Sequence, residues 1–112
     1  MGDWYGVDLD KTLAHYESGD HDKHGPEYIG DPIPKAVKKV QKWLDKGRDV
    51  RLFTGRAADA EQDPAVKRAI DAWMEKNVGQ KLPITDRKDH KLVKFLDDKA
   101  RRVEENTGKR IK

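Results

Sequence analysis

An apolar segment that runs directly into two aspartates constrains the fold of this chain more than any other stretch. Trp4, Tyr5 and Val7 precede Asp8 and Asp10, and aromatic and β-branched residues in such a run predict a buried β-strand. Alternate residues of a strand point to the same side, so the two carboxylates would crowd each other if the strand continued. We therefore expect the strand to end at Asp8. Both acids would then lie at its carboxyl end, where open α/β sheets bind ligands.

The two aspartates also predict a metal site. Carboxylates that share a small cleft repel each other unless a positive charge lies between them. A hard divalent cation with oxygen ligands fits this need. A D-x-D pair is a weak signal by itself in a chain with 21 acidic residues, so the weight of this interpretation depends on the segments that follow.

Apolar strands and amphipathic helices alternate along the rest of the chain. Three further strands are expected, at residues 49–53, 82–85 and 92–96, the second of them at an edge because it contains Pro83. Two helices are expected, one from Pro34 to Gly47 and one from Pro64, with Asp63 as its cap, to Gly79. Residues 101–105 fit an edge strand or a frayed helix, before a turn at residues 106–108. Alternating strands and helices predict a mostly parallel sheet flanked by helices, in a single α/β domain over residues 1–112.

Residues 15–33 form a polar connection that is long for a compact domain, and such segments commonly serve as flaps over a site. The connection carries His15, His21 and His24, whose spacing matches no zinc pattern. We expect a flexible flap here. A substrate-facing role for one histidine is a better interpretation than a metal site.

Composition narrows the class of protein. The chain of 112 residues is 40% charged and 35% hydrophobic, and its apolar residues recur periodically, which indicates a small, well-solvated fold rather than disorder. It has no cysteine, which excludes disulfides and thiolate metal sites. A net charge of +3 with interleaved signs gives no argument for a nucleic-acid surface. No apolar run is long enough to span a membrane and no signal-peptide pattern opens the chain, so we expect a cytoplasmic protein.

Each predicted strand is followed by a different polar group. In chain order these groups are Asp8 and Asp10, then Thr54, Gly55 and Arg56, then Lys88, and finally Asp97 and Asp98. Parallel strands bring their carboxyl ends to one edge of the sheet. Carboxylates there could hold Mg²⁺, an aspartate could attack phosphorus, and hydroxyl, backbone N–H and lysine groups could neutralise phosphoryl oxygens. Together they indicate a phosphoryl-transfer site.

The order and spacing of these groups resemble the haloacid dehalogenase (HAD) superfamily of phosphohydrolases, from Val7 to about Lys99. Residues 8–13 look like its D-x-D-x-T-L motif, and residues 52–56 look like its second motif, an apolar strand that ends in threonine. Lys88 fits the lysine of the third motif, and residues 95–100 look like the D-D type of the fourth. The resemblance implies a HAD-like Rossmannoid domain with a minimal cap or none, because only residues 15–33 are free to form a small flap.

The resemblance also implies roles for individual residues. Asp8 would be the nucleophile and a metal ligand, and Asp10 the general acid and base, with its backbone carbonyl on the metal. Thr54, Gly55 and Arg56 would hold the phosphoryl group.

Two assignments stay open within this scheme. Lys88 fits the spacing best for the lysine that would stabilise the negative charge, and its competitors for that role are Arg87, Lys91 and Lys94. Asp98 is the first choice for the direct Mg²⁺ carboxylate and Asp97 for an orienting role, or the reverse.

The expected function is a Mg²⁺-dependent phosphomonoester hydrolase that works through an aspartyl-phosphate. The T-G-R and D-D-K forms resemble deoxyribonucleotidases and the phosphatase half of polynucleotide kinase-phosphatases. The expected substrate is therefore a phosphorylated small molecule, a nucleotide or a polynucleotide end. The alternative is a regulatory module that binds phosphate or Mg²⁺ with little turnover, although binding alone would not require both Asp8 and Asp10. A receiver-type phospho-acceptor domain fits poorly, because the middle strand ends in Thr54 rather than in an aspartate.

Overall fold

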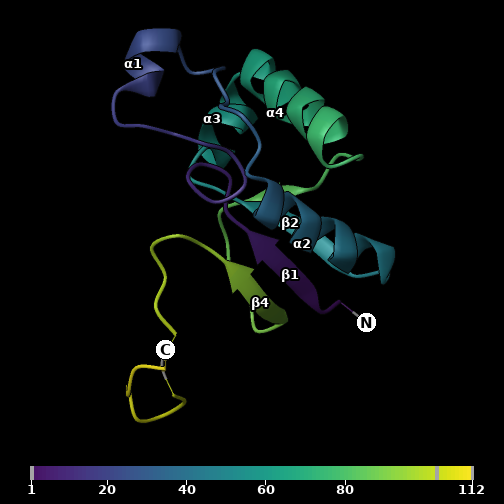
Figure 1. The fold of residues 1–112 in the computed structure, drawn as a ribbon, viewed down its shortest axis with the longest axis vertical. Coiled ribbons are helices and arrows are strands. Elements are labelled where there is room, and N and C mark those ends of the chain that lie inside the picture. The colour runs from purple at the N-terminus through teal and green to yellow at the C-terminus, as the bar shows by residue number, and fades with distance from the viewer. Residues whose placement is uncertain (1, 103, 112) are drawn as a thin grey trace.

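The computed structural model describes residues 2–102 and 104–111. Its four strands form one all-parallel sheet in the order β3-β2-β1-β4, so the prediction of an α/β fold with a parallel sheet is confirmed (Figure 1). The elements in chain order are β1 (Trp4–Val7), α1 (Asp20–His24), α2 (Pro34–Asp45), β2 (Asp49–Phe53), α3 (Ala57–Gln62), α4 (Pro64–Asn77), β3 (Ile84–Thr85) and β4 (Leu92–Leu96).

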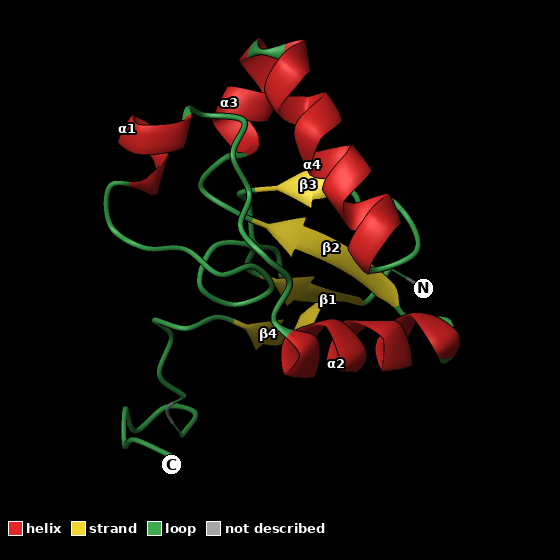
Figure 2. Cartoon of the chain, turned by 45° about the horizontal axis from the view of Figure 1, so that its top comes forward, coloured by secondary structure: helices red, strands yellow, loops and turns green. Residues whose placement is uncertain are grey.

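Three helices contribute to a core on one face of this sheet (Figure 2). Val7 of β1 and Leu52 of β2 are register partners, and both are fully buried. They belong to the same cluster as Val40 of α2, Ala60 of α3 and Ile70 of α4. Burial of these apolar side chains fixes the strands against the helices, so the carboxyl ends of β1 and β2 are held in place beneath the site.

The opposite face of the sheet carries a separate aromatic cluster. Trp4 is fully buried but lies outside the main core cluster, because it points away from Val7. Its indole N–H donates to the Asp89 carboxylate at 2.8 Å, and the Arg51 guanidinium lies 4.8 Å from its ring. The Trp4 hydrogen bond is the main reason that the pKa of Asp89 is lowered. The loop before β4 is thereby fixed to β1.

The two predicted helices begin where the sequence signals place them. Pro34 occupies the first turn of α2, whose Trp43 ring meets the Tyr5 ring edge-on at 4.8 Å, a packing role. The Asp63 side chain caps α4 by accepting the Ala65 N–H at 2.9 Å. The short helix α3 was not predicted, because only one of its residues, an alanine, is buried and it has no apolar stripe.

The C-terminal segment runs away from the sheet (Figure 1). Its described residues between 101 and 105 form neither a strand nor a helix, while position 103 of that predicted stretch lies outside the described residues. The predicted turn is present, with Asn106 and Gly108 at positive φ. Within the described residues, no helix is both long and apolar enough to cross a membrane.

Candidate active site

Most of the predicted site residues line one cavity of about 510 Å³ at the carboxyl ends of the strands. It contains every residue of the predicted set except Lys88 and Asp97: Asp8, Asp10, Thr54, Gly55, Arg56 and Asp98. The loop after β1 is fixed under this cavity because Leu9 and Leu13 are fully buried, and the Leu13 N–H donates to the Leu9 carbonyl at 2.9 Å. The prediction that the strand ends converge is therefore confirmed for these residues.

Three carboxylates form an acidic cluster at the ends of two neighbouring strands. Asp8, Asp97 and Asp98 each offer an oxygen within 4.8 Å of the others. The Asp8 N–H donates to the Leu96 carbonyl at 2.8 Å, which ties the end of β1 to the end of β4. The pKa of Asp8 is raised to about 7, first by burial, then by hydrogen bonds with the Asp98 and Asp97 carboxyls, and also by the charge of Asp97.

The acidic cluster fits a divalent cation. Its donors are carboxylate oxygens, the ligands that Mg²⁺ prefers, and a cation would relieve the repulsion among the three acids, which together with burial raises the pKa of Asp8. Asp97 and Asp98 both belong to the cluster, whereas the Asp10 carboxylate does not. Asp8, Asp97 and Asp98 are therefore the side chains that could hold the ion.

Thr12 connects the two loops that carry these acids. Its hydroxyl accepts the Asp98 N–H at 3.1 Å and lies 3.2 Å from an Asp98 carboxylate oxygen, to which it can donate. This contact fixes the orientation of Asp98 beside Asp8. Thr12 was expected only as part of the D-x-D-x-T-L motif, and its position two residues after Asp10 is the sequence signal for this role.

Arg56 holds Asp10 rather than standing free in the cavity. Its Nε and Nη2 donate to the two oxygens of the Asp10 carboxylate at 2.8 and 2.7 Å, and Nη1 lies 3.4 Å from the Pro26 carbonyl. Only 4% of Arg56 is exposed. In the structure its guanidinium orients Asp10 and contacts the flap, and its predicted contact with a substrate phosphate stays a prediction.

The turn after β2 leaves open space beside its glycine. Thr54 is buried and its hydroxyl accepts the Arg56 N–H at 3.1 Å, which leaves the hydroxyl proton free to donate elsewhere. A Cβ added to Gly55 would meet nothing within 4 Å, and Gly55 is not among the glycines with positive φ. Neither packing nor backbone conformation requires glycine here. A glycine is nevertheless useful where a ligand must approach the backbone closely.

The structure places Lys88 and Lys91, both candidates for stabilising the negative charge, at different edges of the sheet. Lys91 directly precedes β4, so it lies at the edge of the sheet opposite the cavity. The Lys88 ammonium lies over the rings of Phe53 and Phe95, 5.9 and 5.4 Å from their centroids, near the carboxyl ends of β2 and β4. Lys88 does not line the cavity in this conformation, but of the two lysines it is the closer to it.

The flap at residues 15–33 is held at its base. The His15 N–H donates to the Asp31 carbonyl at 2.8 Å, and the Ile33 N–H donates to the Leu13 carbonyl at 2.7 Å. Trp73 of α4 donates from its indole N–H to the Gly30 carbonyl at 2.9 Å. The tip was expected to be a loop, and it instead contains the short helix α1, which has no buried residue. The base of the flap is therefore part of the folded domain.

The three flap histidines have different surroundings. His21 lines the cavity, its ring meets the Tyr16 ring edge-on at 5.1 Å, and its Nε2 is buried with no hydrogen-bond partner among the described residues. His24 stacks on Tyr28 at 4.4 Å, and the exposed His15 faces Glu17. The histidines thus do not gather at one point, and the structure places one of them against the site.

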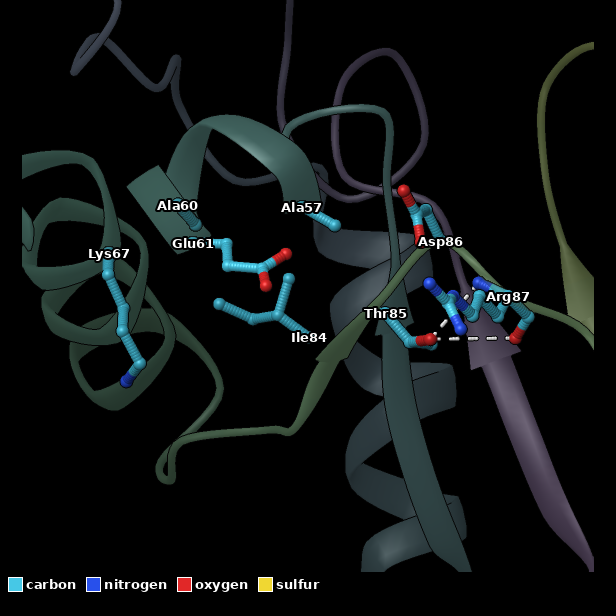
Figure 3. Close-up of a pocket in the computed structure, with 8 residues that line it drawn as sticks. All are labelled: Ala57, Ala60, Glu61, Lys67, Ile84, Thr85, Asp86 and Arg87. Carbon is cyan, nitrogen blue, oxygen red and sulfur yellow. Dashed lines mark hydrogen bonds between the residues drawn. The ribbon is translucent and has the colours of Figure 1, made fainter. Parts of the chain in front are cut away.

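A second cavity of about 440 Å³ lies beside α3 (Figure 3). Glu61 projects from α3 toward β3, where the Thr85 hydroxyl accepts the Arg87 N–H at 3.1 Å (Figure 3). The cavity is lined by Ala57, Ala60, Glu61, Lys67, Ile84, Thr85, Asp86 and Arg87. None of these belongs to the predicted site, so the cavity at the strand ends remains the candidate active site.

Comparison with known proteins adds no relative to this description. No family model, no curated protein and no solved structure matches the chain. The function of the cavity must therefore be argued from its own residues.

Proposed function

We propose that this chain is a Mg²⁺-dependent phosphomonoester hydrolase of the haloacid dehalogenase type, with Asp8 as the nucleophile. The observation that carries the proposal is that the acids at this edge of the sheet have two different surroundings. Asp8 lies in a crowded acidic cluster suited to a cation, while Asp10 is kept apart from it by a two-point ion pair with Arg56. A nucleophile beside a metal and a separate, oriented acid are the two groups that phosphoryl transfer through an aspartate needs.

The cation would be held by Asp8, Asp97 and Asp98. Bound Mg²⁺ supplies positive charge that neutralises phosphoryl oxygens and allows the aspartates to stay ionised together. The remaining chemistry belongs to the side chains of the protein.

In the first step, a carboxylate oxygen of Asp8 attacks phosphorus and the bond from phosphorus to the leaving oxygen breaks. Asp10 gives its proton to that oxygen, so an alcohol leaves and an aspartyl-phosphate remains. The Arg56 contacts hold Asp10 in place, and one Asp10 oxygen must leave the guanidinium to carry the proton that is transferred. The Thr54 hydroxyl and the Gly55 N–H are the proposed donors to the phosphoryl oxygens.

In the second step, water attacks the same phosphorus and gives a proton to Asp10. The bond between phosphorus and the Asp8 oxygen breaks, which releases inorganic phosphate and restores both aspartates. Lys88 is the proposed additional cation for the phosphoryl group. Its exposed contacts with Phe53 and Phe95 are worth only about 0.5–1 kcal/mol, so the ammonium can leave the two rings at little cost.

The covalent intermediate gives a direct test of this proposal. The protein is mixed with p-nitrophenyl phosphate and Mg²⁺, and the reaction is quenched with acid. The protein is then digested, and the masses of its peptides are measured by mass spectrometry. We expect a phosphoryl group on Asp8, and a larger amount of it in Asp10→Asn, because the second step then lacks its base. Asp86→Asn is the matched control, since Asp86 is an exposed carboxylate in the other cavity. A phosphoryl group on another residue, or none in either protein, would contradict the proposal.

A further inference from the structure

We propose that the cavity binds a second anionic group of the substrate between the ammonium groups of Lys11 and Lys99. The preferred substrates would then be phosphomonoesters that carry a further phosphate. This inference rests on the proposed hydrolase function, because it concerns the part of the substrate that does not react. Both lysines line the cavity that contains Asp8 and Asp10.

Lys11 occupies a backbone conformation that favours glycine. Its φ is +70°, in the left-handed region, where a side chain costs free energy that glycine avoids. The Lys11 N–H donates to the Ala14 carbonyl at 2.8 Å, so the tight turn after the two aspartates imposes this conformation. Strained residues of this kind concentrate at functional sites. Here the strained residue supplies a positive charge to the cavity wall.

Lys99 is brought to the same wall by the contact between the two acidic loops. Thr12 and Asp98 are joined by hydrogen bonds of 3.1 and 3.2 Å, and the two lysines are their direct neighbours in sequence. Lys11 precedes Thr12 and Lys99 follows Asp98. The loops after the adjacent strands β1 and β4 thus each contribute one lysine to the lining of the cavity.

These two ammonium groups are free to bind an anion. Arg56 also lines the cavity, but its guanidinium is already engaged by Asp10. Neither Lys11 nor Lys99 forms an ion pair among the described residues, and both are exposed. A divalent cation bound to the acidic cluster would offset two of its three negative charges, which weakens the attraction of that cluster for the lysines. A phosphate is the anion that lysines commonly bind.

The size of the cavity and a histidine of the flap fit a substrate larger than a phosphoryl group. A volume of about 510 Å³ lies in the range of pockets for complete small molecules. His21 lines the cavity from the flap, and its buried Nε2 has no hydrogen-bond partner among the described residues. Buried polar atoms are normally paired. A substrate oxygen would satisfy this nitrogen.

The second phosphate could come from two sources with the same chemistry. A free small molecule with two phosphate groups presents one of them, and an oligonucleotide with a terminal phosphate presents its neighbouring phosphodiester. The test therefore uses two pairs of probes. The first pair is thymidine phosphorylated on both sugar hydroxyls and thymidine phosphorylated on one. The second pair is a terminally phosphorylated oligothymidylate and the same singly phosphorylated thymidine.

The measurement is the ratio of kcat/KM within each pair, which cancels general damage to the enzyme. We expect the wild type to prefer the probe with the second phosphate by about tenfold or more, as a charged contact of about 1.4 kcal/mol provides. Lys11→Gly and Lys99→Gln should each lower that ratio severalfold. Lys11→Gly is informative because it removes the charge and relieves the backbone at the same time, so a folding defect is not expected. Lys46→Gln, an exposed lysine at the end of α2, is the control and should leave the ratio unchanged.

The outcomes separate this inference from the proposed function. A ratio that falls for the first pair of probes supports the site for a free bisphosphate, and one that falls only for the second pair supports it for an oligonucleotide end. Hydrolysis of all probes with a ratio near one, or a ratio that Lys11→Gly and Lys99→Gln do not change, overturns the second-anion site and leaves the hydrolase intact. No hydrolysis of any probe overturns the hydrolase and this inference with it.

Discussion

Arg56 and Asp10 lie 46 residues apart in sequence and form a two-point ion pair, with N–O distances of 2.8 and 2.7 Å. The pair joins the turn after β2 to the loop after β1. Arg56 is almost fully buried, whereas 24% of the Asp10 side chain is exposed. Because planar guanidinium groups match both oxygens of a carboxylate, this contact fixes the direction of Asp10 as well as its position.

Arg56→Lys should therefore destabilise the fold although it keeps the charge. A lysine cannot make the two-point contact, and hydrogen bonds to charged groups contribute about 1.5–3 kcal/mol. We expect a loss of about 2 kcal/mol in the free energy of unfolding, measured with urea. The control is Lys81→Gln, which breaks an exposed pair with Glu75 and should cost only about 0.5 kcal/mol or less. Equal losses of unfolding free energy in the two variants would contradict the claim that the buried two-point contact stabilises the fold more than an exposed ion pair does.

Gly30→Ala should destabilise the base of the flap. A Cβ on Gly30 would clash with the backbone carbonyl of His15, which cannot move freely because the His15 N–H is bonded to Asp31. Overpacking of this kind costs about 1–3 kcal/mol in unfolding free energy. Gly55→Ala is the control, because its Cβ meets nothing within 4 Å. That variant should keep its stability and lose turnover. Normal stability of Gly30→Ala would show that the flap base is not fixed as described.

Thr12→Val should weaken Mg²⁺ binding although it preserves the shape of the side chain. The variant removes the hydroxyl that contacts Asp98 at 3.1 and 3.2 Å. Loss of a group that orients a metal ligand typically lowers affinity about 10–100-fold. Calorimetric titration with Mg²⁺ should show a decrease of about tenfold, whereas Thr85→Val, outside the cavity, should bind as the wild type does. Unchanged Mg²⁺ affinity in Thr12→Val would remove Asp98 from the proposed metal site.

The raised pKa of Asp8, about 7, predicts a pH-dependent stability in the absence of divalent cations. An acid with a higher pKa in the folded chain than in the unfolded chain binds its proton more tightly when folded. The resulting stabilisation is complete below the ordinary value of 3.8 and is lost as the pH rises through about 7. In EDTA, the wild type should therefore lose unfolding free energy over this range relative to Asp8→Asn, which cannot ionise. Parallel pH profiles for the two proteins would contradict the crowding of the three acids.

The sequence predicted the strands well because their signals are local. β1, β2 and β4 are short, largely apolar runs that are each followed by a polar residue, and the structure begins and ends them close to the predicted bounds. The third strand is reduced to Ile84–Thr85. Pro83, which has no N–H to give to the ladder, contributes only its carbonyl, which accepts the Leu52 N–H at 2.8 Å.

Other features depend on how distant turns meet, and no local signal reports them. The sequence spacing predicted that Arg56 and Asp10 lie at the same edge of the sheet. Their ion pair, however, depends on how the turn after β2 packs beside the loop after β1. The helices α1 and α3 escaped prediction because they are short and carry almost no buried surface. Lys91 was separated from Lys88 only when the start of β4 was known, because that boundary decides which edge of the sheet each lysine occupies.

Turnover of p-nitrophenyl phosphate by the wild type and by Asp8→Asn, with Mg²⁺ and with EDTA, tests most directly whether Asp8 carries out the proposed Mg²⁺-dependent hydrolysis of phosphate esters. We predict turnover by the wild type that EDTA abolishes, and none by Asp8→Asn under either condition. Hydrolysis that survives Asp8→Asn would contradict the nucleophile assignment. An inactive wild type that still binds Mg²⁺ would contradict the hydrolase and favour a binding module.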